Sequence, residues 1–308
     1  MHARFVGCDV GKTQIVFFDS HTGQSGTIPN RPEDLATFAA TLDPDGLAIC
    51  EATGGYESPL LAALYAAGRA AHRADARKVK AFIRSFGTLA KTDTIDARAL
   101  ARYGQERQAS LPRWQPTEAQ RATLQALVLT RRDLVAQRTA CSNRLAAPGA
   151  APVRRYLSEL KDCLEAQIRA IDADIDRLLR QSRTLANHAA TLRGISGIGP
   201  ATAAALLALM PELGTLGRRQ AAALAGLAPH PRQSGSADRY RRLQGGRPEV
   251  KRVLFMAALS ARTHNPPLRD FYNRLISNGK KPLVALTALM RKLIIICNAK
   301  LRPAQPAI

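Results

Sequence analysis

Four acidic residues, Asp9, Glu51, Asp93 and Asp96, have types and spacings suited to chemistry on phosphate. Asp9 ends the apolar run FVGCD, and Glu51 ends the apolar run LAICE. Asp93 and Asp96 stand three residues apart at the predicted start of a helix, so both point to one face. A divalent cation relieves the repulsion between clustered carboxylates, and two such ions about 4 Å apart clamp the attacking and leaving oxygens of a phosphoryl transfer. Ligands that are all oxygen suit Mg²⁺ or Mn²⁺.

Each of these carboxylates also has a simpler explanation when it is taken alone. An aspartate at a strand end commonly solvates a loop, Asp93 is a good helix N-cap, and Asp96 can pair with Arg98. The combination favours catalysis, because adjacent strand ends bring Asp9 and Glu51 together and a helix that crosses nearby adds the two aspartates. This layout predicts an RNase H-like nuclease core.

The elements that must position these residues form an α/β pattern in residues 1–110. Three strands come first and are followed by alternating helix and strand, which predicts a mixed sheet. Strands are predicted over residues 3–10, 14–19, 26–29, 46–51 and 69–73, and helices over 32–42, 59–67 and 92–108, with a further helix capped by Asp75.

Residues 111–188 are predicted to form a long antiparallel helical hairpin. One helix covers 117–145, the small residues AAPGAAP form the turn, and a second helix runs to about Ala186 with Leu and Ile at three- and four-residue spacing. Polar outer faces favour a protruding coiled coil that could serve dimerisation, while an ordinary helical core is the alternative.

Residues 189–308 are predicted to form a basic, all-helical domain. One long, basic, glycine-containing loop is expected over Pro229–Gly246. Helices are predicted over 199–209, 217–227, 247–263, 266–276 and 281–301.

The charge of the chain points to a polyanionic partner. The 308 residues carry 45 Lys and Arg against 24 Asp and Glu, a net charge of +21. The excess is uneven, because residues 190–308 hold 19 basic and 4 acidic residues, a net +15. A generically basic surface is the simpler explanation, but a concentrated excess of Arg favours nucleic acid.

The basic loop holds a candidate nucleophile, Ser234. Its Gly235 lets a backbone approach phosphate closely, and its arginines can neutralise phosphate oxygens. A serine here can attack phosphorus and conserve bond energy for religation. From the residues alone, Ser234 is as well explained as a turn residue, and Ser236 is equally well placed. The predicted phosphate contacts are Arg232, Gly235, Arg239, Arg241, Arg242 and Arg247.

A second candidate for nucleic-acid binding is the string GISGIGPATA (194–203), which is similar to a helix-hairpin-helix motif. Gly197 and Gly199 would expose backbone amides, and the N-terminus of the following helix would face phosphate. A tight turn between two packed helices explains the same residues equally well.

Several strings resemble one family, the DEDD transposases of the IS-one-ten class of insertion sequences, relatives of the pilin-gene inverting recombinase. The resemblance covers nearly the whole chain in the right order, and the KTDTIDA and APHPRQSG strings are the specific ones. The strings are GCDVGK, ICEATGGY, KTDTIDARALA, LRGISGIGPATAAALLALMPELG, ALAGLAPHPRQSG and GGRPEVKRVLFMAALSA.

This resemblance implies a RuvC-like domain that holds the four carboxylates, then a coiled coil, then a transposase domain. It implies that Ser234 is the covalent nucleophile on DNA. It further implies a structured bridge RNA that selects donor and target DNA, and active sites shared between the protomers of a homo-oligomer, a dimer or a tetramer.

Two other functions fit the residues. A metal-dependent junction nuclease would hydrolyse DNA with water and need no serine, and a non-catalytic protein would only bind nucleic acid. Five scattered cysteines without a CxxC pair predict reduced thiols, without a zinc site. Without an apolar run of membrane-spanning length or a signal core, we expect a cytoplasmic protein with no membrane contact.

Overall fold

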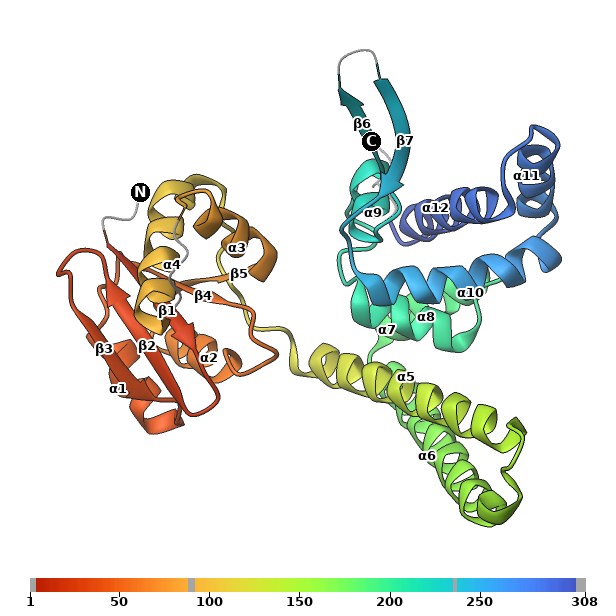
Figure 1. Cartoon of the computed structure of the whole chain (residues 1–308), viewed down its shortest axis with the longest axis horizontal. Coiled ribbons are helices and arrows are strands. Elements are labelled where there is room, and N and C mark those ends of the chain that lie inside the picture. Colours follow the sequence, from red (N-terminus) through yellow and green to blue (C-terminus); the bar gives the residue numbers. More distant parts are fainter. Residues whose placement is uncertain (1–3, 88–91, 235–236, 303–308) are drawn as a thin grey trace. The chain divides into compact units, whose positions relative to one another are not determined.

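The computed structural model describes residues 4–87, 92–234 and 237–302, with side chains omitted for 231–242. The chain divides into two compact units, residues 1–117 and 118–308 (Figure 1). The first unit is built on a sheet and the second is almost entirely helical. The α/β part expected from the sequence is present, and the part expected to be all-α is mostly helical but includes one β-hairpin.

The first unit contains a five-stranded mixed sheet in the order β3-β2-β1-β4-β5. β1 pairs antiparallel with β2 and parallel with β4, so the sheet changes direction at β1. The elements are β1 (Phe5–Val10), β2 (Gln14–Asp19), β3 (Ser25–Pro29), α1 (Pro32–Thr41), β4 (Leu47–Glu51), α2 (Ser58–Ala66), β5 (Ala70–Ala74), α3 (Ala76–Arg84), α4 (Asp93–Arg107) and η1 (Gln108–Ser110).

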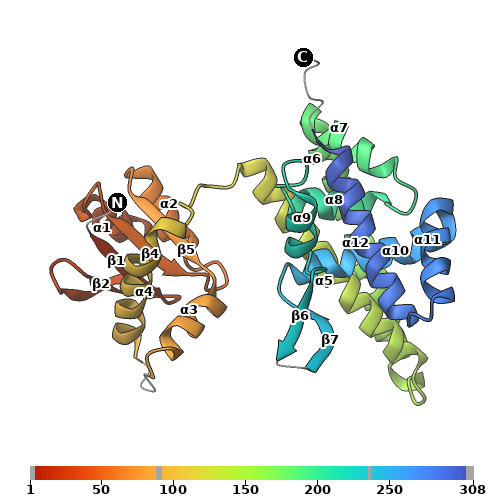
Figure 2. The ribbon, with the colours of Figure 1, turned by 90° about the horizontal axis from the view of Figure 1, so that it is seen from above.

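Helices cover both faces of this sheet, and each face has its own core. Val6 and Cys8 of β1 belong to the cluster that includes residues of α1 and α2. Phe5 of β1 and Ile49 of β4 belong to the cluster that includes residues of α3 and α4. Figures 1 and 2 show α4 across the sheet on the face opposite α1 and α2. Alternation of side chains along each strand therefore decides which helices a residue faces.

The second unit has one main core, formed by its helical body and the base of the α5–α6 hairpin. Its elements are α5 (Ala119–Ala146), η2 (Ala151–Val153), α6 (Arg154–Gln181), α7 (Arg183–Arg193), α8 (Pro200–Leu209), α9 (Arg218–Leu224), β6 (Pro229–Ser234), β7 (Ala237–Leu243), α10 (Pro248–His264), α11 (Pro266–Ser277) and α12 (Pro282–Lys300).

The helical hairpin is formed by α5 and α6, and it is part of the second unit. Leu164, Ile168, Ile171 and Ile175 follow the four- and three-residue spacing of a coiled-coil seam. Leu124 of α5 lies in the main core of the unit, so the base of the hairpin is anchored there. The second helix ends at Gln181, earlier than predicted, because the Ser182 hydroxyl caps a new helix by accepting from the Leu185 amide at 3.3 Å. The predicted boundary at 188–189 lies inside that helix.

The helix α12 is long and apolar, although the sequence predicted no membrane-spanning segment. Within the described part of the chain, α12 is the one helix long and apolar enough to cross a membrane, and 44% of its apolar window is buried in the protein. Leu289, Leu293 and Cys297 belong to the core of the second unit. These contacts are those of a core helix.

Candidate functional site

The carboxylate corner (Asp9, Glu51, Asp93 and Asp96) begins at two neighbouring strand ends. β1 and β4 run parallel, and Cys8 lies opposite Cys50 in their register. Asp9 and Glu51 are the next residues on each strand, so both stand at the carboxyl end of the sheet. Both are half-buried.

Alternation along the strands puts Asp9 and Glu51 on the face that α4 covers. Asp9 is four residues after Phe5 on β1, and Glu51 is two residues after Ile49 on β4, so each acid faces the same side of the sheet as that apolar residue. Phe5 and Ile49 both pack under α3 and α4. Cys8 and Cys50 occupy the opposite face, where burial raises the pKa of the Cys50 thiol to about 12 and keeps it neutral.

Two glycines let α4 lie directly on the sheet. A Cβ on Gly7 would stand 1.9 Å from the carbonyl oxygen of Ala97, and a Cβ on Gly104 would stand 2.3 Å from Cδ1 of Ile49 and 3.1 Å from the ring of Phe5. The helix therefore runs antiparallel to β1. From Gly7 to Asp9 the strand advances about 6.6 Å, and a helix covers the same distance in four to five residues, here from Ala97 back to the start of α4. The first turn of α4 thus lies level with Asp9.

That first turn carries the remaining two carboxylates. The helix α4 begins where the sequence predicted, but its N-cap is Thr92, whose hydroxyl accepts from the Ile95 amide at 3.3 Å, and not Asp93. Asp93 and Asp96 extend the helix face that buries Ala97 and Leu100, and the positive helix N-terminus favours acids there. Asp93 is exposed and Asp96 half-buried.

The elements that carry the four predicted residues therefore place them at one end and one face of the sheet, but not as a closed set of metal ligands. Within the described ranges, no group of three or more His, Cys, Asp or Glu stands ready to hold a metal ion. The donor set itself fits a hard cation, since all four ligands are carboxylates. The assignment of these residues to metal binding stays a prediction.

The loop that follows Glu51 is organised by Glu57, which the sequence analysis missed. The Glu57 side chain is fully buried and accepts hydrogen bonds from Thr53 and Gly55. Burial alone would raise the pKa of Glu57, but hydrogen bonds from its own amide and from Thr53 and Gly55, together with the charge of Arg73, lower it. Glu57 therefore stays ionised at neutral pH. Its position just before α2, in GGYES, resembles an ordinary helix start.

The helix α3 presents a basic surface that the charge count had not located. Arg77, Lys78, Lys80 and Arg84 are exposed, and the helix ARKVKAFIR contains no acid. It begins at Asp75, which caps it as predicted, directly after the carboxyl end of β5. The sequence had attributed most of the positive excess to residues 190–308.

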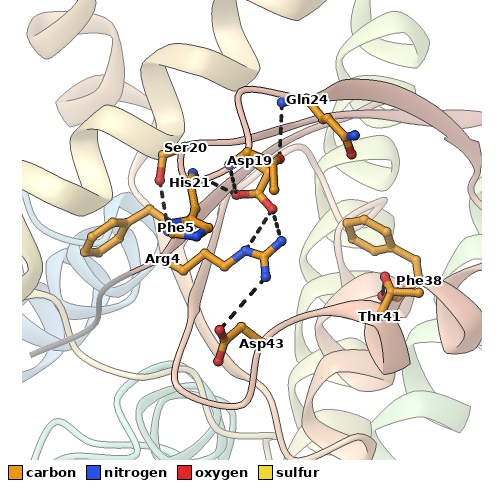
Figure 3. A network of polar contacts seen from close by, with 10 residues as sticks. Arg4, Phe5, Asp19, Ser20, His21, Gln24, Phe38, Thr41 and Asp43 are labelled. Atoms are coloured by element: carbon orange, nitrogen blue, oxygen red, sulfur yellow. Dashed lines mark hydrogen bonds and ion pairs between the residues drawn. The ribbon is translucent and has the colours of Figure 1, made fainter.

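The opposite, amino end of the sheet holds a different acidic group. Arg4 donates to Asp19 through Nε at 2.9 Å and through Nη2, and its Nη1 lies 3.9 Å from Asp43 (Figure 3). Burial acts to raise the pKa of Asp19, but hydrogen bonds from Arg4 and from the amides of His21 and Thr22 outweigh it, so the pKa is lowered. This group closes a turn and fixes the start of β1.

The segment expected to be a loop over 229–246 is instead an antiparallel hairpin of β6 and β7. Ser234 ends β6 and pairs with Ala237, and Arg232 pairs with Arg239. The strands were missed because arginines interrupt the apolar alternation that identifies a strand. Gly235 lies outside the described residues, as do the side chains of Ser234, Arg232, Arg239, Arg241 and Arg242. Their predicted contacts with phosphate remain predictions.

Arg247 has a structural partner that was not expected. Its guanidinium donates to both carboxylate oxygens of Glu212, at 2.8 and 2.5 Å, and to the carbonyl oxygen of Leu209 at 2.7 Å. Burial acts to raise the pKa of Glu212, but the hydrogen bond from Arg247 outweighs it, so the pKa is lowered. Arg247 therefore fixes the start of α10 to the end of α8, and its contact with phosphate stays a prediction.

The GISGIG turn separates α7 from α8, as expected. Gly197 has φ +105°, and a Cβ there would stand 2.6 Å from that of Ala261, so glycine is required by both conformation and packing. Gly199 precedes the first turn of α8, which has Pro200 and no acid, and open space surrounds it. The turn thus has a packing role at Gly197 and an accessible helix N-terminus at Gly199.

Two family models match the chain. The model of DEDD transposases of IS110 elements, described as "Transposase", matches residues 6–147 and so includes the whole carboxylate corner. The model described as "Transposase IS116/IS110/IS902 family" matches residues 189–273, which include the GISGIG turn and the β6–β7 hairpin.

Individual relatives agree with these models. The pilin gene-inverting protein of Moraxella lacunata is 28% identical over 99% of this chain and 98% of its own length. The 43.6 kDa protein of insertion element IS110 from Streptomyces coelicolor is 32% identical over 50% of this chain and 38% of its own. The 44.8 kDa protein of IS116 from Streptomyces clavuligerus is 30% identical over 49% and 39%.

Proposed function

The chain belongs to the IS116/IS110/IS902 family of transposases, and we propose that it cuts and rejoins DNA through the carboxylate corner and Ser234. A DNA transposase acts on DNA, and the DEDD type of domain requires a divalent metal in general. Our proposal adds the identity of the metal, the residues that bind it, and the nucleophile.

The convergence of Asp9, Glu51, Asp93 and Asp96 at one end of one sheet face carries this proposal. These carboxylates would bind Mg²⁺, with Mn²⁺ as a substitute, and the mixed sheet with acids at this end supports an RNase H-like, RuvC-like unit. A bound Mg²⁺ would neutralise charge on the phosphate that reacts. The half-buried Asp9 and Glu51 fix the position of that phosphate relative to the sheet, and the basic face of α3 begins beside it.

Ser234 is proposed as the nucleophile, on the strength of the family resemblance of APHPRQSG. Its hydroxyl oxygen would form a bond to phosphorus, lose its proton to a base, and displace one DNA oxygen, which leaves as a DNA hydroxyl. Attack by a DNA hydroxyl on the serine phosphodiester reverses these bond changes and rejoins a strand. The bond energy is conserved, so no external energy source is needed.

We further propose that a structured bridge RNA selects the donor and target DNA, and that the protein acts as a homo-oligomer, a dimer or a tetramer. The carboxylates and Ser234 belong to different units of the chain, so active sites shared between protomers fit the proposal. The coiled-coil spacing of α6 supports the hairpin as a dimerisation surface.

A trap for the covalent intermediate tests this function. Full-length protein with its co-purifying RNA and its element-end DNA should form a denaturant-resistant protein–DNA adduct that maps to Ser234. Ser234→Ala should lose the adduct and strand exchange but still bind DNA, while the matched control Ser236→Ala should keep both.

Cleavage without an adduct, unaffected by Ser234→Ala, would instead identify a nuclease that uses water. Mixing Asp9→Asn with Ser234→Ala protein then tests shared sites. Partial recovery of strand exchange in the mixture is expected if protomers share sites, and a mixture as inactive as each variant would contradict sharing.

A further inference from the structure

The loop between Glu51 and α2 is held by a single buried carboxylate. Glu57 Oε2 accepts from the Thr53 amide at 3.1 Å, from the Thr53 hydroxyl at 3.2 Å and from the Gly55 amide at 2.9 Å. The Glu57 carboxylate is fully buried, so hydrogen bonds from donors of the loop replace those that water would make. The conformation of residues 52–57 therefore depends on Glu57.

The backbone of that loop cannot be set by local preference alone. Gly54 and Gly55 adopt φ of +75° and +107°, which favour glycine and allow many alternatives when nothing fixes them. The Gly55 amide is fixed by Glu57, and the Ala52 amide donates to Ala74 at 3.1 Å, which continues the pairing of β4 with β5 past Glu51. Glu51 is thus held on its C-terminal side as well as by its own strand.

Arg73 supplies the countercharge to Glu57. Its Nη2 lies 2.7 Å from Glu57 Oε1, and Arg73 stands opposite Cys50 in the register of β4 and β5. About half of the Arg73 side chain is exposed, so the ion pair extends from the buried loop to the surface. A buried carboxylate without such a partner would be costly.

Asn30 connects this loop to the one that follows Asp9. Its Nδ2 donates to the carbonyl oxygen of Gly11 at 3.0 Å and to that of Tyr56 at 3.1 Å. Gly11 is two residues after Asp9, and Tyr56 is next to Glu57. A single amide group therefore fixes the distance between the two loops that extend from the strand ends of the corner.

We propose that Asn30, Glu57 and Arg73 are positioning residues that set the spacing of Asp9 and Glu51 for a divalent cation. This inference rests on the proposed function of the corner. The residues do not bind the cation themselves. They hold the two loops so that the carboxylates need less rearrangement to share an ion, which raises affinity through preorganisation.

An effect on stability can be distinguished from an effect on cation binding, because the same sheet offers a matched control. Asp19 is a buried carboxylate paired with Arg4 and with two turn amides, but it lies at the amino end and contacts neither loop of the corner. Asp19→Asn should lower stability as Glu57→Gln does, without a change at the corner.

The test measures Mn²⁺ binding to full-length protein by electron paramagnetic resonance, together with thermal unfolding. Glu57→Gln and Asn30→Ala should weaken Mn²⁺ binding by about tenfold or more, in the range found for groups that orient metal ligands. Asp19→Asn should bind Mn²⁺ like the wild type. Because Asn30 is only half-buried, Asn30→Ala keeps the test open if Glu57→Gln does not fold.

Hydrogen exchange without metal provides a second measurement. The Thr53 and Gly55 amides should exchange faster in Glu57→Gln, whereas Asp19→Asn should affect the His21 and Thr22 amides instead. Two results would overturn this inference but leave the metal site intact, provided that Asp9→Asn abolishes Mn²⁺ binding. One is that folded Asn30→Ala and Glu57→Gln bind Mn²⁺ as tightly as the wild type. The other is that Asp19→Asn weakens Mn²⁺ binding as much as they do. Wild-type protein that binds no Mn²⁺ would overturn the proposed metal site and the inference together.

Discussion

The two ends of the sheet in the first unit use buried ion pairs in opposite ways. At the amino end, Arg4 pairs with Asp19, and the remaining donors to that carboxylate come from the adjoining turn. At the carboxyl end, Arg73 pairs with Glu57, whose other donors belong to the loop after Glu51. The first pair closes a local turn, whereas the second supports a loop that leads away from a cluster of acids.

This difference shows where the fold accepts an energetic cost. Carboxylates gathered at one place repel one another, so the four acids at the carboxyl end cost stability unless a cation binds. Among the described residues at the amino end, the acids Asp19 and Asp43 both lie near Arg4, whose positive charge offsets their repulsion. Stability at one end and binding at the other are expected to respond differently to the same substitutions.

The largest effect is expected where the helix that carries Asp93 and Asp96 meets the sheet. Gly7→Ala should lower the free energy of unfolding by about 3 kcal/mol or more and abolish cleavage, because the new Cβ would meet the backbone of Ala97. Gly104→Ala is the matched control. Its new Cβ would meet side-chain atoms of Ile49 and Phe5 and no backbone atom, so the loss of stability should be smaller. Urea unfolding measures both, and equal losses would contradict the close approach of α4.

The next largest effect compares the same substitution, Asp to Asn, at the two ends of the sheet. Asp9→Asn should lower DNA strand cleavage by more than about 100-fold, since even groups that only orient a metal ligand cost 10–100-fold. Folding and non-specific DNA binding should persist, because the basic surface is intact. Asp19→Asn should cleave within about twofold of the wild type. Wild-type cleavage by Asp9→Asn would eliminate the proposed corner.

A smaller effect is expected in stability, and it depends on pH. The lowered pKa of Asp19 means that its contribution is fully present above about pH 4 and is lost as pH falls through that lowered value. Asp19→Asn should therefore cost about 1–3 kcal/mol of unfolding free energy at pH 7 and less at pH 3. A cost that does not shrink in acid would show that the ion pair is not its source.

The elements of the first unit followed from the sequence because hydrophobic periodicity is a local signal. Apolar runs located β1 and β4, and Asp75 marked the start of a helix through capping, which acts within three residues. The meeting of Asp9 and Glu51 at one sheet end also followed, since both end predicted strands.

The contacts that hold the loops and helices in place could not be predicted from the sequence, because they join residues far apart along the chain. Asn30 bonds Tyr56 across 26 residues and Arg247 bonds Glu212 across 35, and no spacing rule relates such positions. The β6–β7 hairpin was hidden by its arginines. Arg247 shows the limit of a charge argument, because its guanidinium also has a carboxylate partner within the protein.

Mapping the divalent cation on the chain shows whether it binds at the carboxyl end of the sheet. Fe²⁺ can replace Mg²⁺ among oxygen ligands, and with peroxide and ascorbate it cleaves nearby backbone. We expect fragments of full-length protein that end near residues 9, 51 and 93–96, suppressed by excess Mg²⁺ and by Asp9→Asn. Fragments that end near residues 4, 19 and 43, or a pattern unaffected by Asp9→Asn, would contradict this expectation.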